Sequence, residues 1–239
     1  MTNFISAGHT PALTYAVETL QKAYSFSSPE NAKYLLLPVP SFDGDGYIRG
    51  GGNVAHLLKE LPRDITVIGG LLAHPALANY HTIDLLEDPF YIAKNANITA
   101  HCAIRLAMQK LPLTLEHCPV LVIGWGRIGQ CLCRLLQGLR ADITVAARKD
   151  FDRAMLTALG IRAIAPEEID TTRYRLIFNT APAMILPQCP GDALKIDLAS
   201  QLGLGGLDVI WARGLPGKDA PESSGQLIAE SIIRILDKE

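Results

Sequence analysis

Residues 120–129 read Val-Leu-Val-Ile-Gly-Trp-Gly-Arg-Ile-Gly, and this stretch decides the fold of the chain. Four apolar residues of strand length lead into Gly124-x-Gly126-x-x-Gly129, and apolar residues at helical spacing follow. In such a turn the first glycine permits a tight bend, the second lets the backbone approach a pyrophosphate, and the third permits close packing of helix on strand. The helix N-terminus adds N–H donors and a positive dipole end. The spacing therefore favours a dinucleotide-binding turn over a glycine turn that holds no ligand.

Apolar runs of strand length recur from residue 120 onward, and helices are expected in most of the gaps between them. This rhythm is typical of an α/β fold, a Rossmann-type doubly wound parallel sheet. The expected strands span residues 120–123, 143–147, 161–163, 176–179, 194–197 and 209–211.

The first half of the chain is less regular and predicts a smaller, shortened α/β substrate domain. It offers short strands and helices around a Gly-rich loop at residues 39–53, and it ends in a helix from about 88 to 111. The expected division is a substrate or partner domain at 1–95, joined by the last helix at 222–239, and a nucleotide domain at 96–221. The elements expected before the long helix are strands at 4–6, 34–38 and 66–68 and helices at 11–22 and 54–61.

Composition limits the function classes. The 239 residues are 49% hydrophobic and 19% charged, as in ordinary globular enzymes, and the net charge of −2 gives no general attraction to nucleic acid or to an acidic membrane. The N-terminus lacks a signal-peptide pattern and no apolar run could span a bilayer, so a cytoplasmic protein is expected. The five cysteines have no metal-ligand spacing, which predicts reduced thiols and no metal site.

The end of the second nucleotide-domain strand predicts the cofactor. NAD sites usually place an acidic residue there, whereas this strand runs into Arg148-Lys149. Two cations suit a 2′-phosphate through charge-assisted hydrogen bonds, and Arg127, beside Ile128 in the glycine turn, adds a third. The sequence therefore favours NADP, with NAD possible and a solvated basic corner as the alternative.

Loops after the later strands are expected to line the nicotinamide pocket, because ligands bind at the carboxyl ends of strands in such sheets. The candidates are Thr180, Ala181 and Pro182 after one strand, Ser200 after the next and Pro216 after the last. Ordinary turn chemistry is the alternative for each of them taken alone.

None of the six histidines follows the glycine turn, which disfavours a D-2-hydroxy-acid dehydrogenase with its late acid–base histidine. His101 stands out because it is near Asn95 and Thr99 at the expected start of the interdomain helix, where a helix N-terminus could hold a carboxylate. A surface or packing role is the alternative for this residue. Histidine is nevertheless the side chain best suited to act as a base near neutral pH.

In combination, several segments resemble the A-subunit family of dipicolinate synthase. The later ones, Asn-Thr-Ala-Pro-Ala-Met-Ile-Leu, Ile-Asp-Leu-Ala-Ser and Gly-Leu-Pro-Gly-Lys-Asp-Ala-Pro, are far more specific than the glycine turn. The resemblance covers most of the chain. The segments that carry it are residues 36–39, 95–99, 122–129, 147–149, 179–186, 196–200 and 214–226.

The resemblance implies a two-domain, dehydrogenase-like enzyme of the last step of dipicolinate formation, in the mother cell of a spore-forming bacterium. Dihydrodipicolinate, or its hydrated form, would be oxidised with NAD(P)⁺ between the two domains, and the partner would be the flavoprotein-like B subunit of dipicolinate synthase. A homo-oligomer is also expected. The substrate is a small dicarboxylate, for which Asn95, Thr99, Ser200 and Arg213 are candidate partners.

The chain departs from the family pattern at two places. A glycine-rich first βα turn is replaced by residues 7–11, and a Pro-Thr-x-Glu-Gly-like run after Asn95 is replaced by residues 98–102, so that His101 stands where the family has an acidic residue. These departures leave two alternatives open: a non-catalytic NADP-binding protein whose partner does the chemistry, and another NAD(P)-dependent dehydrogenase of a small carboxylate.

Overall fold

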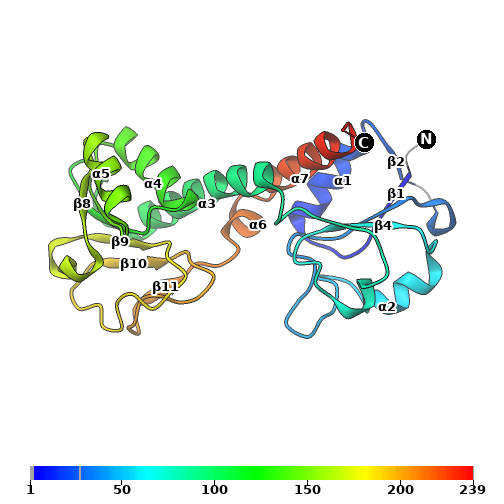
Figure 1. Ribbon diagram of the computed structural model, residues 1–239, viewed down its shortest axis with the longest axis horizontal. Coiled ribbons are helices and arrows are strands. Elements are labelled where there is room, and N and C mark those ends of the chain that lie inside the picture. Colours follow the sequence, from blue (N-terminus) through cyan, green and yellow to red (C-terminus); the bar gives the residue numbers. More distant parts are fainter. Residues whose placement is uncertain (1–2, 27, 239) are drawn as a thin grey trace. The chain divides into compact units, whose positions relative to one another are not determined.

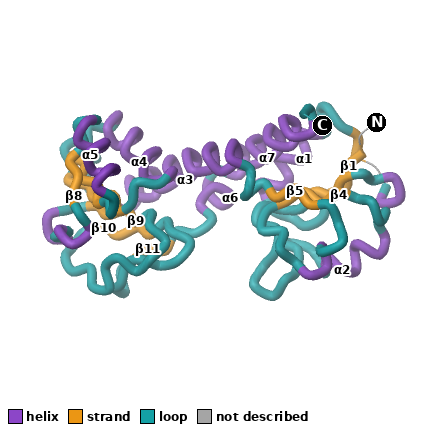
Figure 2. The backbone as a smooth tube through the Cα atoms, in the orientation of Figure 1, coloured by secondary structure: helices purple, strands orange, loops and turns teal. Residues whose placement is uncertain are grey.

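The computed structural model describes residues 3–26 and 28–238 of the chain (Figure 1). The chain divides into two compact units. The first unit consists of residues 1–95 together with 216–239, and the second unit consists of residues 96–215. Each unit is built around a parallel β-sheet, shown in orange in Figure 2.

The second unit holds a six-stranded sheet in the order β11-β10-β9-β6-β7-β8, and all of its strand pairs are parallel. Because the chain winds outward from β6 in both directions, the predicted doubly wound Rossmann-type sheet is confirmed. Apolar residues with no exposed surface, among them Leu121 and Ile177, form its core. The strands are β6 (Pro119–Ile123), β7 (Asp142–Ala146), β8 (Arg162–Ile164), β9 (Leu176–Asn179), β10 (Leu194–Asp197) and β11 (Val209–Trp211).

The expectation that helices fill most of the gaps in this sheet is wrong. Helices α4 (Arg127–Gly138) and α5 (Asp150–Ala158) connect the first strands, but β8 is followed only by the 3₁₀ turns η4 (Pro166–Glu168) and η5 (Thr171–Arg173). No helix separates β9 from β10 or β10 from β11. Residues 180–193 carry three prolines and residues 198–208 three glycines, which are poor helix formers.

The first unit holds a five-stranded parallel sheet in the order β2-β1-β3-β4-β5. Strands β2 and β5 were not expected from the sequence, because two or three residues are too few for a periodic signal. The elements are β1 (Asn3–Ser6), β2 (Ser25–Phe26), β3 (Tyr34–Leu36), β4 (Thr66–Gly69), β5 (Thr82–Asp84), α1 (Pro11–Leu20), α2 (Val54–Leu57), η1 (Pro29–Asn31), η2 (Leu58–Glu60) and η3 (Pro75–Leu77).

Helices α3, α6 and α7 complete the description. Helix α7 (Pro221–Leu236) follows α6 (Leu215–Asp219) and packs on α1 within the first unit. The two helices approach closely because Gly225 has no side chain: a Cβ there would lie 2.5 Å from the carbonyl oxygen of Ala12. Helix α3 (Pro89–Lys110) begins after Asp88, whose carboxylate accepts a hydrogen bond from the Tyr91 N–H at 2.8 Å.

The five cysteines are free thiols, as expected. Cys133 is buried, and burial raises the pKa of its thiol to about 12, so this thiol remains protonated at neutral pH. Within the described part of the chain, no group of three or more His, Cys, Asp or Glu residues could hold a metal ion. Nor does any helix among the described residues have the length and apolar character needed to cross a membrane.

Candidate dinucleotide site

The glycine turn between β6 and α4 has the geometry that its spacing predicts. Gly124 has a φ of +98°, and a Cβ on it would lie 2.6 Å from Oγ1 of Thr180. A Cβ on Gly129 would lie 2.3 Å from the carbonyl oxygen of Gly124, so this residue sets the distance between helix and strand. By contrast, no atom lies within 4 Å of the Cβ position of Gly126. The turn is therefore closed on its strand side and open at Gly126, where a pyrophosphate would approach.

Thr180 closes the turn from the neighbouring strand end. Its hydroxyl donates to the carbonyl oxygen of Ile123 at 2.9 Å, and its backbone N–H donates to the same oxygen at 2.8 Å. Because β9 pairs with β6, this residue ties two adjacent carboxyl ends together. Thr180 thus has a structural role in holding the turn, in addition to its expected place in the pocket wall.

A basic corner lies at the end of β7, beside the turn. Ala147 is buried, whereas Arg148 and Lys149 are exposed, and Arg127 is exposed in the first turn of α4. Since β6 and β7 are neighbours in the sheet, these cations project from adjacent strand ends. Residues 146–149 carry no carboxylate that could accept from a ribose hydroxyl.

The backbone of the basic corner is held by Arg153, a residue that sequence reasoning missed. Its Nη1 donates to the carbonyl oxygens of Ala147 at 2.7 Å and Arg148 at 2.9 Å, and its Nη2 pairs with Asp150. The guanidinium therefore orients the two residues that precede Lys149. No pattern in the sequence indicates this role, because it depends on where α5 begins.

A buried carboxylate connects the loops after β9 and β10. Asp197 has no exposed surface, and its Oδ2 accepts from the N–H groups of Gly203 at 2.8 Å and Leu204 at 3.1 Å. The same oxygen accepts from Nδ2 of Asn179 at 2.9 Å, and Oδ1 accepts from the Ala199 N–H at 3.0 Å. Four donors thus replace the water that a carboxylate loses on burial.

Asn179 extends this network to the loop that carries the expected pocket residues. Its Oδ1 accepts from the Ala181 N–H and its Nδ2 donates to the Ala181 carbonyl oxygen, both at 3.1 Å. Gly203 must lack a side chain, since a Cβ there would lie 2.5 Å from Nδ2 of Asn179. The interaction between Asn179 and Asp197 was not predicted from the sequence. Each is a polar residue at the end of a mostly apolar strand.

Among the expected pocket residues, Thr180, Ala181, Pro182 and Ser200 follow the adjacent strands β9 and β10. Pro182 and Ser200 are exposed, and Ala181 is half-buried. Ile128 is half-buried in the first turn of α4. Pro216 differs, because it lies in α6 and belongs to the first unit.

The structure does not bring the three expected catalytic residues together. Along a helix Asn95 and Thr99 are about 40° apart, whereas Thr99 and His101 are about 160° apart, so His101 lies on another face. Thr99 is buried and His101 is exposed. The expectation that His101 lies at a helix start is also wrong, because α3 begins at Pro89 and the N–H groups near His101 are within the helix.

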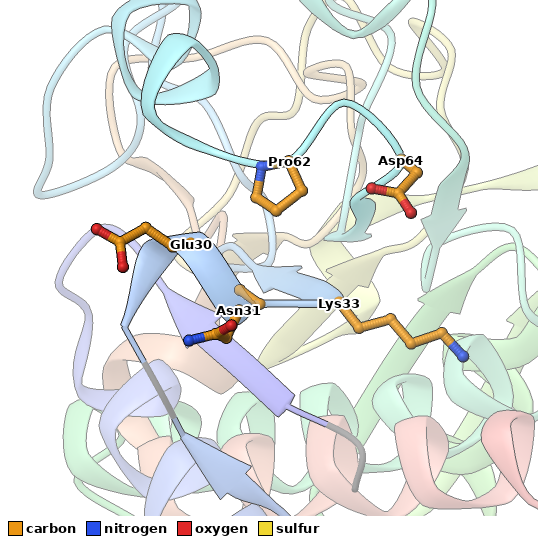
Figure 3. A pocket seen from close by; sticks show the side chains of 6 residues that line it. Glu30, Asn31, Lys33, Pro62 and Asp64 are labelled. Atoms are coloured by element: carbon orange, nitrogen blue, oxygen red, sulfur yellow. The ribbon is translucent and has the colours of Figure 1, made fainter.

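A shallow hollow in the first unit is not a candidate for the ligand site. It is lined by Glu30, Asn31, Ala32, Lys33, Pro62 and Asp64, which precede β3 and β4. Figure 3 shows the Lys33 side chain extending away from Glu30. Because its lining residues precede β3 and β4, the hollow lies at the amino edge of its sheet, opposite the edge at which ligands bind in parallel α/β sheets.

Comparisons with known proteins agree with the resemblance noted in the sequence. No protein-family model matches the chain. The chain is 27% identical over 228 residues to the A subunit of dipicolinate synthase from Bacillus subtilis, an alignment that covers 84% of this chain and 77% of that protein. The crystal structure of the corresponding protein from Bacillus halodurans superposes with a TM-score of 0.86 at 19% identity, covering 98% of this chain and 97% of that chain.

Other solved structures share the fold. The transhydrogenase from Sinorhizobium meliloti superposes with a TM-score of 0.70 at 12% identity, covering 100% of this chain and 94% of that chain. D-lactate and L-alanine dehydrogenases are also among the structural neighbours. The chain thus shares its fold with these dehydrogenases, and its resemblance to the A-subunit family of dipicolinate synthase is confirmed in both sequence and fold.

Proposed function

We propose that this protein is the A subunit of a dipicolinate synthase, which oxidises dihydrodipicolinate or its hydrated precursor to dipicolinate with NADP⁺. The observation that carries the proposal is the turn at 124–129, open at Gly126 and flanked by exposed cations, in a chain that is similar in sequence to the A subunit of a dipicolinate synthase. The sporulation role and partnership with a flavoprotein-like B subunit are part of the same proposal.

The chain's own residues would bind and orient the reactants. The α4 N-terminus and the backbone at Gly126 suit the pyrophosphate, and the loops joined by Asp197 suit the nicotinamide end. When bound, NADP⁺ accepts a hydride from a ring carbon of the substrate. Dihydrodipicolinate also loses one proton, so that two hydrogen atoms leave in all and the ring becomes aromatic. The hydrated precursor loses one water molecule in addition. The protein's task is therefore orientation and charge matching.

Cofactor choice is tested at the basic corner. Replacing Arg148 and Lys149 together by alanine should raise the Kd for NADP⁺ roughly tenfold or more, because two charge-assisted contacts to the 2′-phosphate are removed. The Kd for NAD⁺ should change much less. Titration of both cofactors by fluorescence gives the two constants. Arg162→Ala, an exposed cation at the amino end of β8, is the matched control and should affect neither cofactor. Equal losses for both cofactors in the double variant would contradict the NADP assignment.

The reaction is tested by reconstitution. The purified chain, with and without the flavoprotein-like partner, is mixed with the products of dihydrodipicolinate synthase and NADP⁺, and dipicolinate is measured chromatographically. Dipicolinate is expected when both proteins are present. Formation by this chain alone would exclude the role of a non-catalytic scaffold. Absence of dipicolinate with both proteins and either cofactor would overturn the proposal.

His101 is the proposed proton acceptor in that assay. What supports it is that its ring is exposed and makes no hydrogen bond or ion pair with another described residue. The other histidine of the second unit, His117, precedes β6 at the amino edge of the sheet. His101→Asn should slow single-turnover oxidation by about 10²-fold and leave NADP⁺ binding unchanged. His117→Asn, with a φ of 55° that asparagine tolerates, is the control. An unchanged rate in His101→Asn would remove the assignment.

A further inference from the structure

The carboxyl edge of the first unit's sheet is extended by loops that pair with one another. The N–H of His9 donates to the carbonyl oxygen of Arg49 at 3.0 Å, and the N–H of Arg49 donates to the carbonyl oxygen of Ser41 at 2.9 Å. The N–H of Ser41 in turn donates to the carbonyl oxygen of Gly70 at 2.8 Å. Four segments therefore lie side by side at the spacing of strands, about 4.8 Å apart.

This edge is held rigidly by the buried Ser41. Its hydroxyl donates to the carbonyl oxygen of Pro38 at 2.8 Å and accepts from the Gly70 N–H at 3.0 Å. A Cβ on Gly69 would lie 2.3 Å from the same hydroxyl oxygen. On the other side, Gly50 has a φ of +66°, and a Cβ there would lie 2.1 Å from the His9 carbonyl oxygen. The backbone that carries the side chains of this edge is therefore fixed in position.

Arg49 projects from this fixed backbone, and the two Nη groups of its guanidinium form a planar fork. Its Nε donates to the carbonyl oxygen of Phe42 at 2.9 Å, which orients the group. Within residues 3–26 and 28–238, its two Nη groups make no hydrogen bond and no ion pair. The nearby Asp43 carboxylate instead accepts from the N–H groups of Asp45 and Tyr47, at 3.0 and 2.9 Å. An oriented, exposed fork of this kind fits a carboxylate with two parallel hydrogen bonds.

Leu71 is strained and exposed on the same edge. Its φ is +57°, which is unfavourable for a residue with a Cβ, and its side chain is 60% exposed. The conformation is imposed from both sides, because Gly70 is bound by Ser41 and the Leu72 N–H donates to the carboxylate of Asp84 at 2.8 Å. A strained backbone and an exposed apolar side chain are each unfavourable in the free protein, and strained positions concentrate at ligand sites.

We propose that this edge is a carboxylate-binding site, in which the Nη fork of Arg49 holds a carboxylate and Leu71 covers the apolar face of the ring that bears it. The identity of this ligand as a pyridine dicarboxylate rests on the proposed function. The site itself rests on the arrangement of the first unit alone. Tyr47, 48% exposed in the same loop, supplies a second apolar surface.

The test measures binding of pyridine-2,6-dicarboxylate to the full chain by isothermal titration calorimetry, without divalent cations and with or without NADP⁺. Arg49→Gln should raise the Kd at least tenfold, and Arg49→Lys should give an intermediate loss because a charge remains without the fork. Arg63→Gln removes an exposed cation that precedes β4, at the opposite edge, and should leave the Kd unchanged.

Leu71→Gly separates a binding role from a structural one. Glycine adopts a positive φ without strain, so the Tm should rise by roughly 2 °C while the dicarboxylate binds several-fold more weakly. A residue that served folding alone would not weaken binding when the fold became more stable. Wild-type affinity in Arg49→Gln, equal losses in Arg63→Gln, or no binding by the unaltered chain with and without NADP⁺ would each overturn the site.

The two proposals fail in different ways. If the dicarboxylate binds through Arg49 but the reconstituted protein does not oxidise dihydrodipicolinate, the site stands and the reaction assignment falls. If oxidation is observed and Arg49→Gln has the KM and Kd of the unaltered chain, the reaction stands and the site falls.

Discussion

Gly129→Ala is expected to abolish dinucleotide binding, with at least a hundredfold rise in the Kd for NADP⁺. The added Cβ would lie 2.3 Å from the carbonyl oxygen of Gly124, a backbone atom that cannot rotate away. Helix α4 must then move away from β6, which displaces the N–H groups that would face the pyrophosphate. The binding constant is measured by fluorescence titration on protein whose fold has been checked by circular dichroism.

The same helix provides a matched control for that substitution. Gly138 is the last residue of α4, and no atom lies within 4 Å of its Cβ position. Gly138→Ala should therefore leave the Kd unchanged and stabilise the protein by up to about 1 kcal/mol, because alanine favours the helix. If Gly129→Ala bound NADP⁺ as the unaltered chain does, close packing of helix on strand would not be what forms this site.

Asp197→Ala is expected to lower the Tm by roughly 10 °C, equivalent to a loss of about 3 kcal/mol or more in the free energy of unfolding. The substitution leaves the backbone N–H groups of three buried residues without their acceptor and removes one of the two acceptors of the Asn179 amide. The loops after β9 and β10 lose their common anchor, so NADP⁺ binding should weaken as well. Calorimetry and cofactor titration measure the two effects separately.

Two further variants test whether the effect of Asp197→Ala comes from losing its buried hydrogen bonds. Asp142→Ala removes an exposed carboxylate at the start of β7, whose partner His117 is 3.8 Å away, and should change the unfolding free energy by less than about 0.5 kcal/mol. Asp197→Asn keeps the shape but sets an N–H against one of the backbone donors, so it should fall between the unaltered chain and Asp197→Ala. A Tm within about 1 °C of the unaltered protein in Asp197→Ala would contradict the anchoring role.

Local signals predicted most of the second unit. The six strands fall within two residues of their expected limits, and the glycine turn has the expected geometry. These features depend on short-range periodicity and on the steric demands of single glycines. Both can be identified from neighbouring residues in the sequence. The long helix α3 was also predicted, since its 22 residues give a strong periodic signal.

The residues that hold the candidate site together were not predictable in the same way. Asp197 and Asn179 are 18 positions apart and meet only because β9 and β10 pair in register. Likewise, Arg49 and Leu71 come to one edge only through the backbone hydrogen bonds that join residues 49, 41 and 70. His101 and Thr99, by contrast, are close in the sequence but lie on different faces of α3, because two steps along a helix nearly reverse the direction of a side chain.

The sequence by itself determined the Rossmann-type sheet, the position of the glycine turn and the basic end of β7, because each consists of contiguous residues whose periodicity, size or charge acts locally. Only the tertiary structure decided which loops are anchored by a buried carboxylate, which atom orients the Arg49 guanidinium and which face of α3 carries His101. Those properties arise from pairing between distant segments and from burial, and both are fixed when the sheets assemble.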